Sequence, residues 1–291
     1  MSKLLNAERR GRDSTLTRHG AGESGNKLNA ISGCSVNTKE YEKMYNLEDS
    51  YWWFVGKRRI AQNLIEEFVP LNQREAILDV GCGTGATMCL LDHYGRAYGI
   101  DISEMALGFC QERALEGLSR ASALRLPFAD GYFSLITAFD MLYHEEVIDD
   151  LTALREFHRV CKEGGSVLIS EPAFNFLWSW HDVAYHGKRR YVARELKSKL
   201  EQVGFQVVKL SYSNTLLFPF IFAFRMWKRL SSPSPGDHSD LKPLNLYLNK
   251  ALAAVYNLEA SLVCKTRLPL GSPVVCVARK PKGGWRMKNG G

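Results

Sequence analysis

The sequence lacks any apolar run of the roughly 18–20 residues that a helix needs to cross a membrane. It also lacks the apolar core of a secretory signal near its N-terminus, so we expect a cytoplasmic protein. Its seven cysteines include no C-x-x-C pair and have no regular spacing. This argues against a disulfide framework and a cysteine-based metal site, and we predict no metal. What remains is an ordinary globular composition, 45% hydrophobic and 24% charged over 291 residues, sufficient for one large core with additions.

The chain has few acids relative to its bases, which gives a formal net charge of +7. This charge favours nucleic acid, acidic lipid surfaces or phosphorylated substrates as partners and does not choose among them. Residues 1–37 are rich in Ser, Gly, Asn and Arg and predict a disordered tail. An organelle transit peptide is the alternative, and the acids Glu8, Asp13 and Glu23 count against it.

One stretch combines an apolar strand pattern with closely spaced glycines. Ile77 to Val80 leads directly into glycines at positions 81, 83 and 85, and helix-forming residues follow from Ala86 to Tyr94. A strand, a glycine turn and a helix bring the backbone close to a ligand at a helix N-terminus. The spacing is G-x-G-x-G, unlike the G-x-G-x-x-G of dinucleotide folds. With Asp79 two residues ahead, it resembles motif I of class I S-adenosylmethionine-dependent methyltransferases.

Further motifs follow in the order of that family. Ala97–Asp101 is a short strand ending in a carboxylate, an acceptor suited to the vicinal hydroxyls of a ribose. Ala121–Phe128 and the strand up to Asp140 resemble the third and fourth motifs, although Ser122 stands where many relatives have aspartate. The resemblance covers residues 75 to 210. It implies a Rossmann-like seven-stranded α/β sheet, S-adenosyl-L-methionine as cofactor, and cofactor binding by Asp79, Gly81, Cys82, Gly83, Gly85, Asp101, Ile102, Ser122, Ala123 and Asp140.

The remaining chain divides around this core, which we place at 75–212. Residues 38–74 predict a helical lid with an aromatic and basic cluster, Tyr51–Arg59. The cluster could stack on a ligand or simply pack the lid onto the sheet. Residues 213–271 form an insertion between strands six and seven, and 272–291 the last strand and a basic tail. The insertion begins with an apolar run that ends in Trp and basic residues, a composition typical of an interfacial membrane element. A lid or a subunit interface is the alternative.

Candidate catalytic and substrate-binding residues follow strands four and five. His144 is a candidate general base, although it could merely shape its loop, and Glu171 is a second candidate. The loop after strand five is dense in His, Arg and Tyr and predicts an anion or sugar-phosphate pocket. A metal site at His181, Asp182 and His186 is disfavoured because no third strong ligand is evident. The predicted substrate-binding residues are His186, Arg189, Arg190 and Tyr191.

The acceptor is the part of the function that these motifs define least. The chain lacks the Asn/Asp-Pro-Pro-Tyr and Pro-Cys motifs of nucleobase methyltransferases. The aromatic cluster, the basic loop and the apolar insertion resemble methyltransferases of glycan and polyprenyl-lipid pathways. We therefore predict methylation of a hydroxyl or carboxyl of an amphiphilic or glycan-lipid small molecule, with peripheral contact to an anionic membrane. An RNA or protein methyltransferase, or a non-catalytic scaffold, is the alternative.

Overall fold

The computed structural model describes residues 38–72, 74–231 and 241–283. The tail predicted at 1–37 lies outside these residues, and so does the end of the basic tail beyond residue 283. The described elements include seven strands: β1 Ala76–Val80, β2 Arg96–Asp101, β3 Leu118–Arg120, β4 Phe133–Phe139, β5 Cys161–Pro172, β6 Gln206–Tyr212 and β7 Pro273–Arg279.

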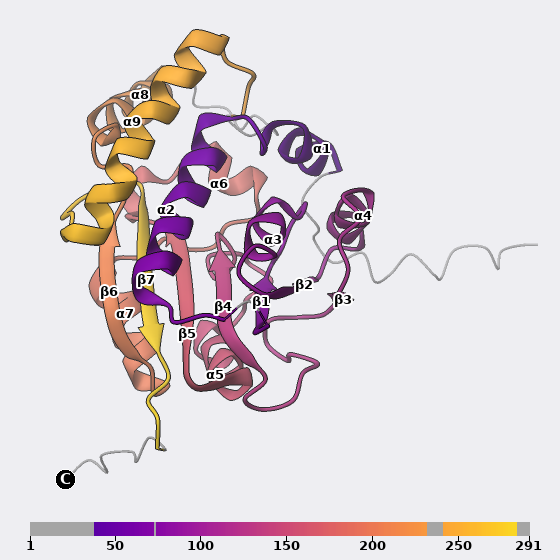
Figure 1. The fold of residues 1–291 in the computed structure, drawn as a ribbon. Coiled ribbons are helices and arrows are strands. Elements are labelled where there is room, and N and C mark those ends of the chain that lie inside the picture. Colours follow the sequence, from indigo (N-terminus) through magenta and orange to yellow (C-terminus); the bar gives the residue numbers. More distant parts are fainter. Residues whose placement is uncertain (1–37, 73, 232–240, 284–291) are drawn as a thin grey trace, which may run out of the picture. The chain divides into compact units, whose positions relative to one another are not determined.

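These strands form a single sheet in the order β3-β2-β1-β4-β5-β7-β6, in which β7 runs antiparallel to both of its neighbours (Figure 1). Strands β2 and β3 are added on one side of β1, and the chain then returns to place β4 on the other side, so the strand order reverses between β1 and β4. In open α/β sheets, ligands bind outside the carboxyl ends of the strands at such a switch point. The arrangement confirms the predicted Rossmann-like, seven-stranded class I methyltransferase sheet.

Helices cover both faces of the sheet (Figure 1). One apolar cluster joins the sheet to α2, α3, α4 and α9, and a second joins the other face to α5 and α7. The described helices are α1 Thr38–Leu47, α2 Trp52–Phe68, α3 Ala86–Leu91, α4 Glu104–Glu112, α5 Asp150–Val160, α6 Trp180–Ala184, α7 Ala193–Gln202, α8 Phe218–Ser231 and α9 Leu246–Lys265.

The segment 38–74, predicted as a helical lid, contains two helices. Helix α1 ends at Leu47, and Tyr51 has extended backbone angles before α2 begins. The amide of Asn249 in α9 holds this junction, because it accepts a hydrogen bond from the Trp52 N–H at 2.9 Å and donates one to the Ser50 carbonyl at 2.8 Å. The break places the end of α1 close to the glycine turn, a contact that a single straight helix would not make.

Helix α2 packs closely on α9, which lies between β6 and β7 in the chain. Gly56 makes the approach possible, since any Cβ there would overlap the Tyr256 ring. Trp52 and Trp53 lie beside the same ring, with centroids 6.0 and 6.1 Å away. Part of the aromatic cluster therefore packs the helices together, as the second interpretation of its sequence proposed.

Candidate active site

A cavity of about 240 Å³ lies at the carboxyl ends of β1, β2 and β4. Its floor is formed by the glycine turn and the residues that directly follow these strands. Residues of α1, α2 and α6 line the rest, together with Leu241. The cavity is therefore placed at the edge where the sheet topology predicts a ligand.

The glycine turn approaches the cavity with its backbone. Gly81 and Gly83 have φ angles of +72° and +55°, which favour glycine, and both line the cavity with Cys82. The N–H groups of Gly81 and Cys82 donate to the Ile100 carbonyl at 2.8 and 3.0 Å, so the turn folds back onto β2. Gly85 differs, because it lies outside the cavity lining, and a Cβ there would meet Leu115 and Cys110. Its predicted contact with the cofactor is thus replaced by packing against α4.

Two buried carboxylates face the cavity. Asp101 accepts hydrogen bonds from the backbone N–H groups of Gly83 at 3.0 Å and Ser103 at 2.8 Å. Burial raises its pKa, and these N–H donors oppose that shift. Asp79 accepts from the Thr137 hydroxyl at 2.6 Å, and burial raises its pKa to about 7. The other predicted cofactor-binding residues on the cavity lining are Ile102, Ser122, Ala123 and Asp140.

Sequence reasoning missed a buried acid directly after α1 that supports the glycine turn. Glu48 lies at the cavity, accepts a hydrogen bond from the Thr84 hydroxyl and pairs at 2.8 Å with Arg113, the C-cap residue of α4. Burial raises the pKa of Glu48, while Thr84 and Arg113 oppose the shift. Nothing local in the sequence indicates this contact, because the partners are 36 and 65 positions away.

His144 does line the cavity, as predicted. Its Nδ1 accepts a hydrogen bond from the Glu146 N–H at 3.3 Å, so the neutral ring carries its proton on Nε2. Burial, with a smaller contribution from His186, lowers its pKa to about 4. The occupied Nδ1 and the lowered pKa make this ring a weak proton acceptor, and its role as general base stays a prediction.

Glu171, the second candidate base, does not line the cavity, and its catalytic role stays a prediction. Its carboxylate is fully buried and accepts from the backbone N–H groups of Met141, Leu142 and Tyr143. Burial, followed by the charge of Asp140, raises its pKa to about 8. The side chain therefore holds the loop after β4, which itself forms part of the cavity wall.

None of the four predicted substrate-binding residues lines the cavity. His186 Nδ1 lies 2.8 Å from a Glu145 carboxylate oxygen. Arg189 donates to the Val147 carbonyl and pairs with Asp150 at 2.9 Å. His186, Arg189, Arg190 and Tyr191 thus lie outside this cavity, and the anion pocket predicted from them stays a prediction.

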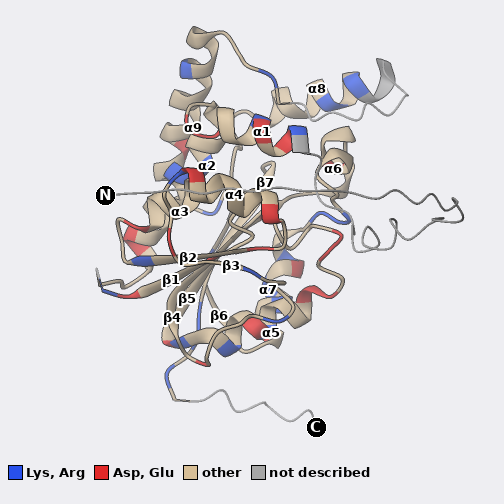
Figure 2. Ribbon diagram, turned by 90° about the vertical axis from the view of Figure 1, so that its right-hand side faces the viewer, with Lys and Arg blue, Asp and Glu red and all other residues tan. Residues whose placement is uncertain are grey.

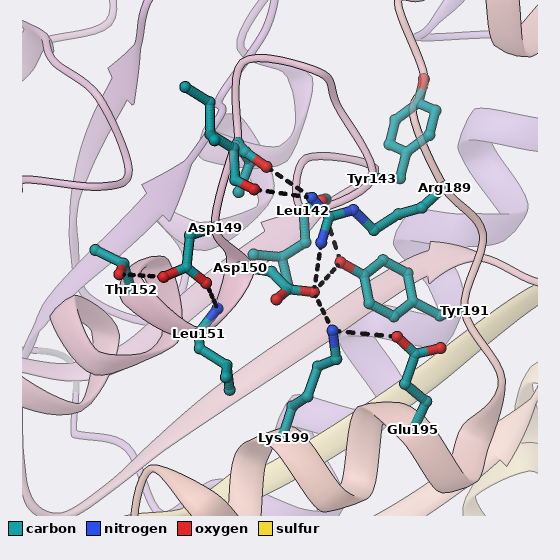
Figure 3. Close-up of polar contacts among 12 residues, drawn as sticks. Leu142, Tyr143, Asp149, Asp150, Leu151, Thr152, Arg189, Tyr191, Glu195 and Lys199 are labelled. Atoms are coloured by element: carbon teal, nitrogen blue, oxygen red, sulfur yellow. Dashed lines mark hydrogen bonds and ion pairs between the residues drawn. The ribbon is translucent and has the colours of Figure 1, made fainter.

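The last two residues of that set are buried and structural. Arg190 makes a two-pronged ion pair with Asp182 and donates to the Ala173 carbonyl at 2.9 Å. The Tyr191 hydroxyl lies 2.8 Å from the Asp150 carboxylate, where Lys199 also pairs (Figure 3). Lys199 and Tyr191 keep the pKa of Asp150 below its usual range although burial opposes this. These residues fix the loop that carries His144.

Backbone hydrogen bonds between the loop after β4 and the segment around His186 explain where helix α5 begins. Residues 145–149 precede the helix, because the Glu145 N–H donates to the His186 carbonyl and the Lys188 N–H donates to the Tyr143 carbonyl. Asp149 then caps α5 by accepting from the Leu151 N–H at 3.0 Å (Figure 3). Within the described residues, no group of three His, Cys, Asp or Glu side chains is arranged to hold a metal ion.

The wall opposite the glycine turn is aromatic and basic. It includes Trp53, Phe54, Lys57 and Arg58 of α2, and His181 and Tyr185 from α6 and its C-cap. The Lys57 ammonium pairs with the Asp140 carboxylate, so α2 is joined to the end of β4. The aromatic and basic cluster in the sequence was the available signal for this wall. Trp53 both lines the cavity and packs on the Tyr256 ring, whereas Trp52 packs on that ring without lining the cavity.

Residues 78–169 match the family described as a methyltransferase domain. This segment is similar to a methyltransferase domain. The match agrees with the resemblance to class I S-adenosylmethionine-dependent methyltransferases that the sequence motifs carry. It covers the strands and loops that form the cavity floor.

Curated relatives match over the same region. Demethylmenaquinone methyltransferase of Staphylococcus aureus is 31% identical over 142 residues, which are 46% of this chain and 56% of that protein. Norajmaline N-methyltransferase of Rauvolfia serpentina is 28% identical over 134 residues, 39% of this chain and 44% of that protein. The chain thus spans about half the length of these relatives.

The fold also occurs in phosphoethanolamine N-methyltransferase 2 of Haemonchus contortus, whose structure contains S-adenosyl-L-methionine. The TM-score is 0.53 at 14% identity, covering 85% of this chain and 61% of that chain. At this identity the likeness concerns the fold.

Proposed function

We propose that this chain transfers a methyl group from S-adenosylmethionine to a hydroxyl or carboxyl oxygen of a small amphiphilic or glycan-lipid acceptor. The observation that carries the proposal is the two-sided cavity. Glycine turns and buried carboxylates line one side, and an aromatic and basic wall lines the other. Such a cavity can hold a cofactor and an acceptor next to each other.

The first side has the donor chemistry that S-adenosylmethionine requires. Asp79 offers a buried carboxylate suited to an ammonium group, and Asp101 offers acceptors for ribose hydroxyls. Gly83 leaves the turn without a side chain where the cofactor would pass. When bound, the cofactor supplies an electrophilic methyl group on a sulfonium. The protein then has to orient the acceptor and remove its proton.

Asp140 is the carboxylate that best suits this proton transfer. It lies on the cavity lining directly after β4, and Lys57 pairs with it from α2. A carboxylate at this position can accept the proton of an acceptor hydroxyl. His144 on the same wall would donate a hydrogen bond to the acceptor through Nε2.

The opposite wall supports an acceptor that is apolar with a polar or anionic group. Trp53, Phe54 and Leu241 offer apolar contacts, and Lys57 and Arg58 bring positive charge. Among the curated relatives, one is named for demethylmenaquinone and another for norajmaline, so small-molecule acceptors occur among them. The RNA and protein alternatives rest on net charge alone. The cytoplasm, where free thiols persist, remains the proposed location, together with peripheral contact to an anionic membrane.

The cofactor part of the proposal is tested by changing Asp101 to alanine. Loss of a charged hydrogen-bond partner should weaken S-adenosylmethionine binding by ~1.5–3 kcal/mol, measured by calorimetry. Asp130→Ala is the matched control, because Asp130 is exposed and pairs with Arg159 away from the cavity. Unchanged affinity in the Asp101 variant, with the fold intact by circular dichroism, would refute the ribose assignment.

The acceptor part is tested with cofactor that carries a labelled methyl group. The protein is incubated separately with a total lipid extract, with RNA and with a protein extract from the same cells. We expect label in the lipid fraction, and its loss in the Asp140→Asn variant although cofactor binding persists. Label confined to RNA or to protein would overturn the proposed acceptor and favour the corresponding alternative.

A further inference from the structure

Helix α8 has an inner face that is firmly packed on the protein. Phe218 is buried, and Phe222 packs with Phe176 of the segment before α6, their ring centroids 6.0 Å apart. The Arg225 guanidinium donates to the Leu177 carbonyl and lies 3.8 Å from Asp182. Phe218 and Arg225 therefore attach α8 to the protein, and Phe222, which is 40% exposed, lies at the border of this face.

The outer face of α8 is apolar and exposed. Phe220 is 73% exposed and Trp227 is 65% exposed, and Phe224 lies between them at 49%. These residues are three and four positions apart, so they lie along one side of the helix. Large aromatic side chains in a continuous row are unusual on a surface that faces only water.

Helix α9, like α8, has one buried face and one exposed apolar face. Tyr256, Ala260 and Val263 are buried against the protein, whereas Tyr247, Leu258 and Leu262 are exposed. Tyr247, at 82% exposure, lies at the first turn of the helix. Two helices of the segment between β6 and β7 thus present apolar outer faces.

The charge around these faces has one sign. Among the described residues between β6 and β7, the only acid is Glu259, which is buried and accepts a hydrogen bond from the Leu216 N–H. Bases are exposed on the same segment, at Lys242, Lys250, Lys265 and Arg267. Figure 2 shows basic positions and no acidic ones along the part of α8 that it colours. Helix α8 and the start of α9 lie at the same end of the domain as α1 and α6.

We propose that the outer faces of α8 and α9 dock on the surface of an anionic lipid bilayer. Exposed aromatics enter the boundary between headgroups and acyl chains, and the lysines meet the lipid phosphates. No helix among the described residues has the length and apolar character needed to cross a bilayer, so the contact would be peripheral. Charge decides the occupant, because an apolar face of a second copy of this chain would bring the same positive charges together.

The position of Leu241 connects this surface to the cavity. Leu241 belongs to the same segment, next to Lys242, yet it is buried and lines the cavity. Docking would place the cavity beside the bilayer, where an amphiphilic acceptor is concentrated. This last step rests on the proposed function, whereas the docking itself does not.

The test is co-sedimentation of the full chain with vesicles of phosphatidylcholine alone or with added phosphatidylserine. We expect binding only to the phosphatidylserine vesicles, and weaker binding at high salt. Lys242→Glu and Lys250→Glu should each lower the vesicle affinity about fivefold or more, because each removes attraction to the anionic surface. Lys197→Glu on α7 is the matched charge control and should change the affinity less than twofold.

The apolar contribution is tested with Phe220→Ser and Trp227→Ser combined. Both side chains are mostly exposed, so the variant should keep its cofactor affinity and thermal unfolding temperature while losing vesicle binding. Tyr132→Ser is the control, since Tyr132 is exposed before the first residue of β4, at the opposite end of that strand from the cavity. Absence of binding to phosphatidylserine vesicles at low salt overturns the proposal. So does concentration-dependent dimerisation that the same double substitution abolishes. Failure to bind S-adenosylmethionine, with vesicle binding intact, would count against the proposed function only.

Discussion

The glycine turn after β1 and the stretch His186–Tyr191 both concentrate distinctive residues after a strand, yet only the first lines the cavity. The turn acts through its backbone, whose φ angles and N–H positions are encoded locally by glycine. The second stretch acts through long charged side chains, which reach whichever partner the fold places within range. In this protein those partners are Glu145, Asp150 and Asp182. A glycine pattern therefore predicts a site more reliably than a run of charged residues does.

The strongest test of this difference between the two segments is the Arg190→Ala substitution. The substitution leaves Asp182 buried beside an empty space, and removing one member of a buried ion pair typically costs 3–5 kcal/mol, so we expect a loss of about 3–5 kcal/mol in the free energy of unfolding. Chemical denaturation measures it. Under native conditions the affinity for S-adenosylmethionine should stay within about twofold of the wild-type value, because Arg190 does not line the cavity.

A neighbouring arginine provides the control. Arg194 is exposed on α7, so Arg194→Ala should change stability by no more than about 0.5 kcal/mol. If Arg190→Ala kept its stability and lost activity toward a lipid acceptor, the stretch would be a substrate site after all.

The sequence was sufficient for the sheet and for placing the glycine turn. Asp79, Gly81, Gly83 and Asp101, which the sequence predicted to bind the cofactor, line the cavity because each lies at or directly after the carboxyl end of a strand. The acceptor side was harder to predict. Glu171 follows the same rule of position, yet its carboxylate turns toward three backbone N–H groups. Side-chain direction at a strand end depends on the neighbouring loop, which sequence patterns do not specify.

A second prediction sharpens the distinction between helices that line the cavity and helices that support it. A Cβ at Gly56 would overlap the Tyr256 ring, whereas a Cβ at Gly108 of α4 would meet nothing within 4 Å. Gly56→Ala should destabilise the protein by about 1–3 kcal/mol through overpacking. Gly108→Ala should instead stabilise it by about 0.5–1 kcal/mol, since alanine is the better helix former. Thermal or chemical unfolding of the two variants gives the comparison.

The pair also tests the contact between α2 and α9 directly. Adding Tyr256→Leu to Gly56→Ala makes room for the new methyl group. The double variant should therefore be less destabilised than the sum of its two single variants. Strict additivity would mean that α2 and α9 do not approach each other as closely as the structure shows.

The last prediction concerns the pH dependence that the buried ring of His144 confers on stability. Burial lowers its pKa in the folded protein to about 4, below the ordinary value near 6.5 that applies to the unfolded chain. As the pH falls below about 6.5, the unfolded chain therefore binds a proton that the folded protein refuses, and stability declines until about pH 4. Between pH 7 and pH 5 the wild-type protein should lose about 1–2 kcal/mol more unfolding free energy than His144→Gln. His158, whose pKa burial also lowers to about 4, predicts the same direction for His158→Gln. Equal pH dependence in wild type and His144→Gln would mean that His144 is protonated as readily when folded as when unfolded, which would favour it as a candidate base.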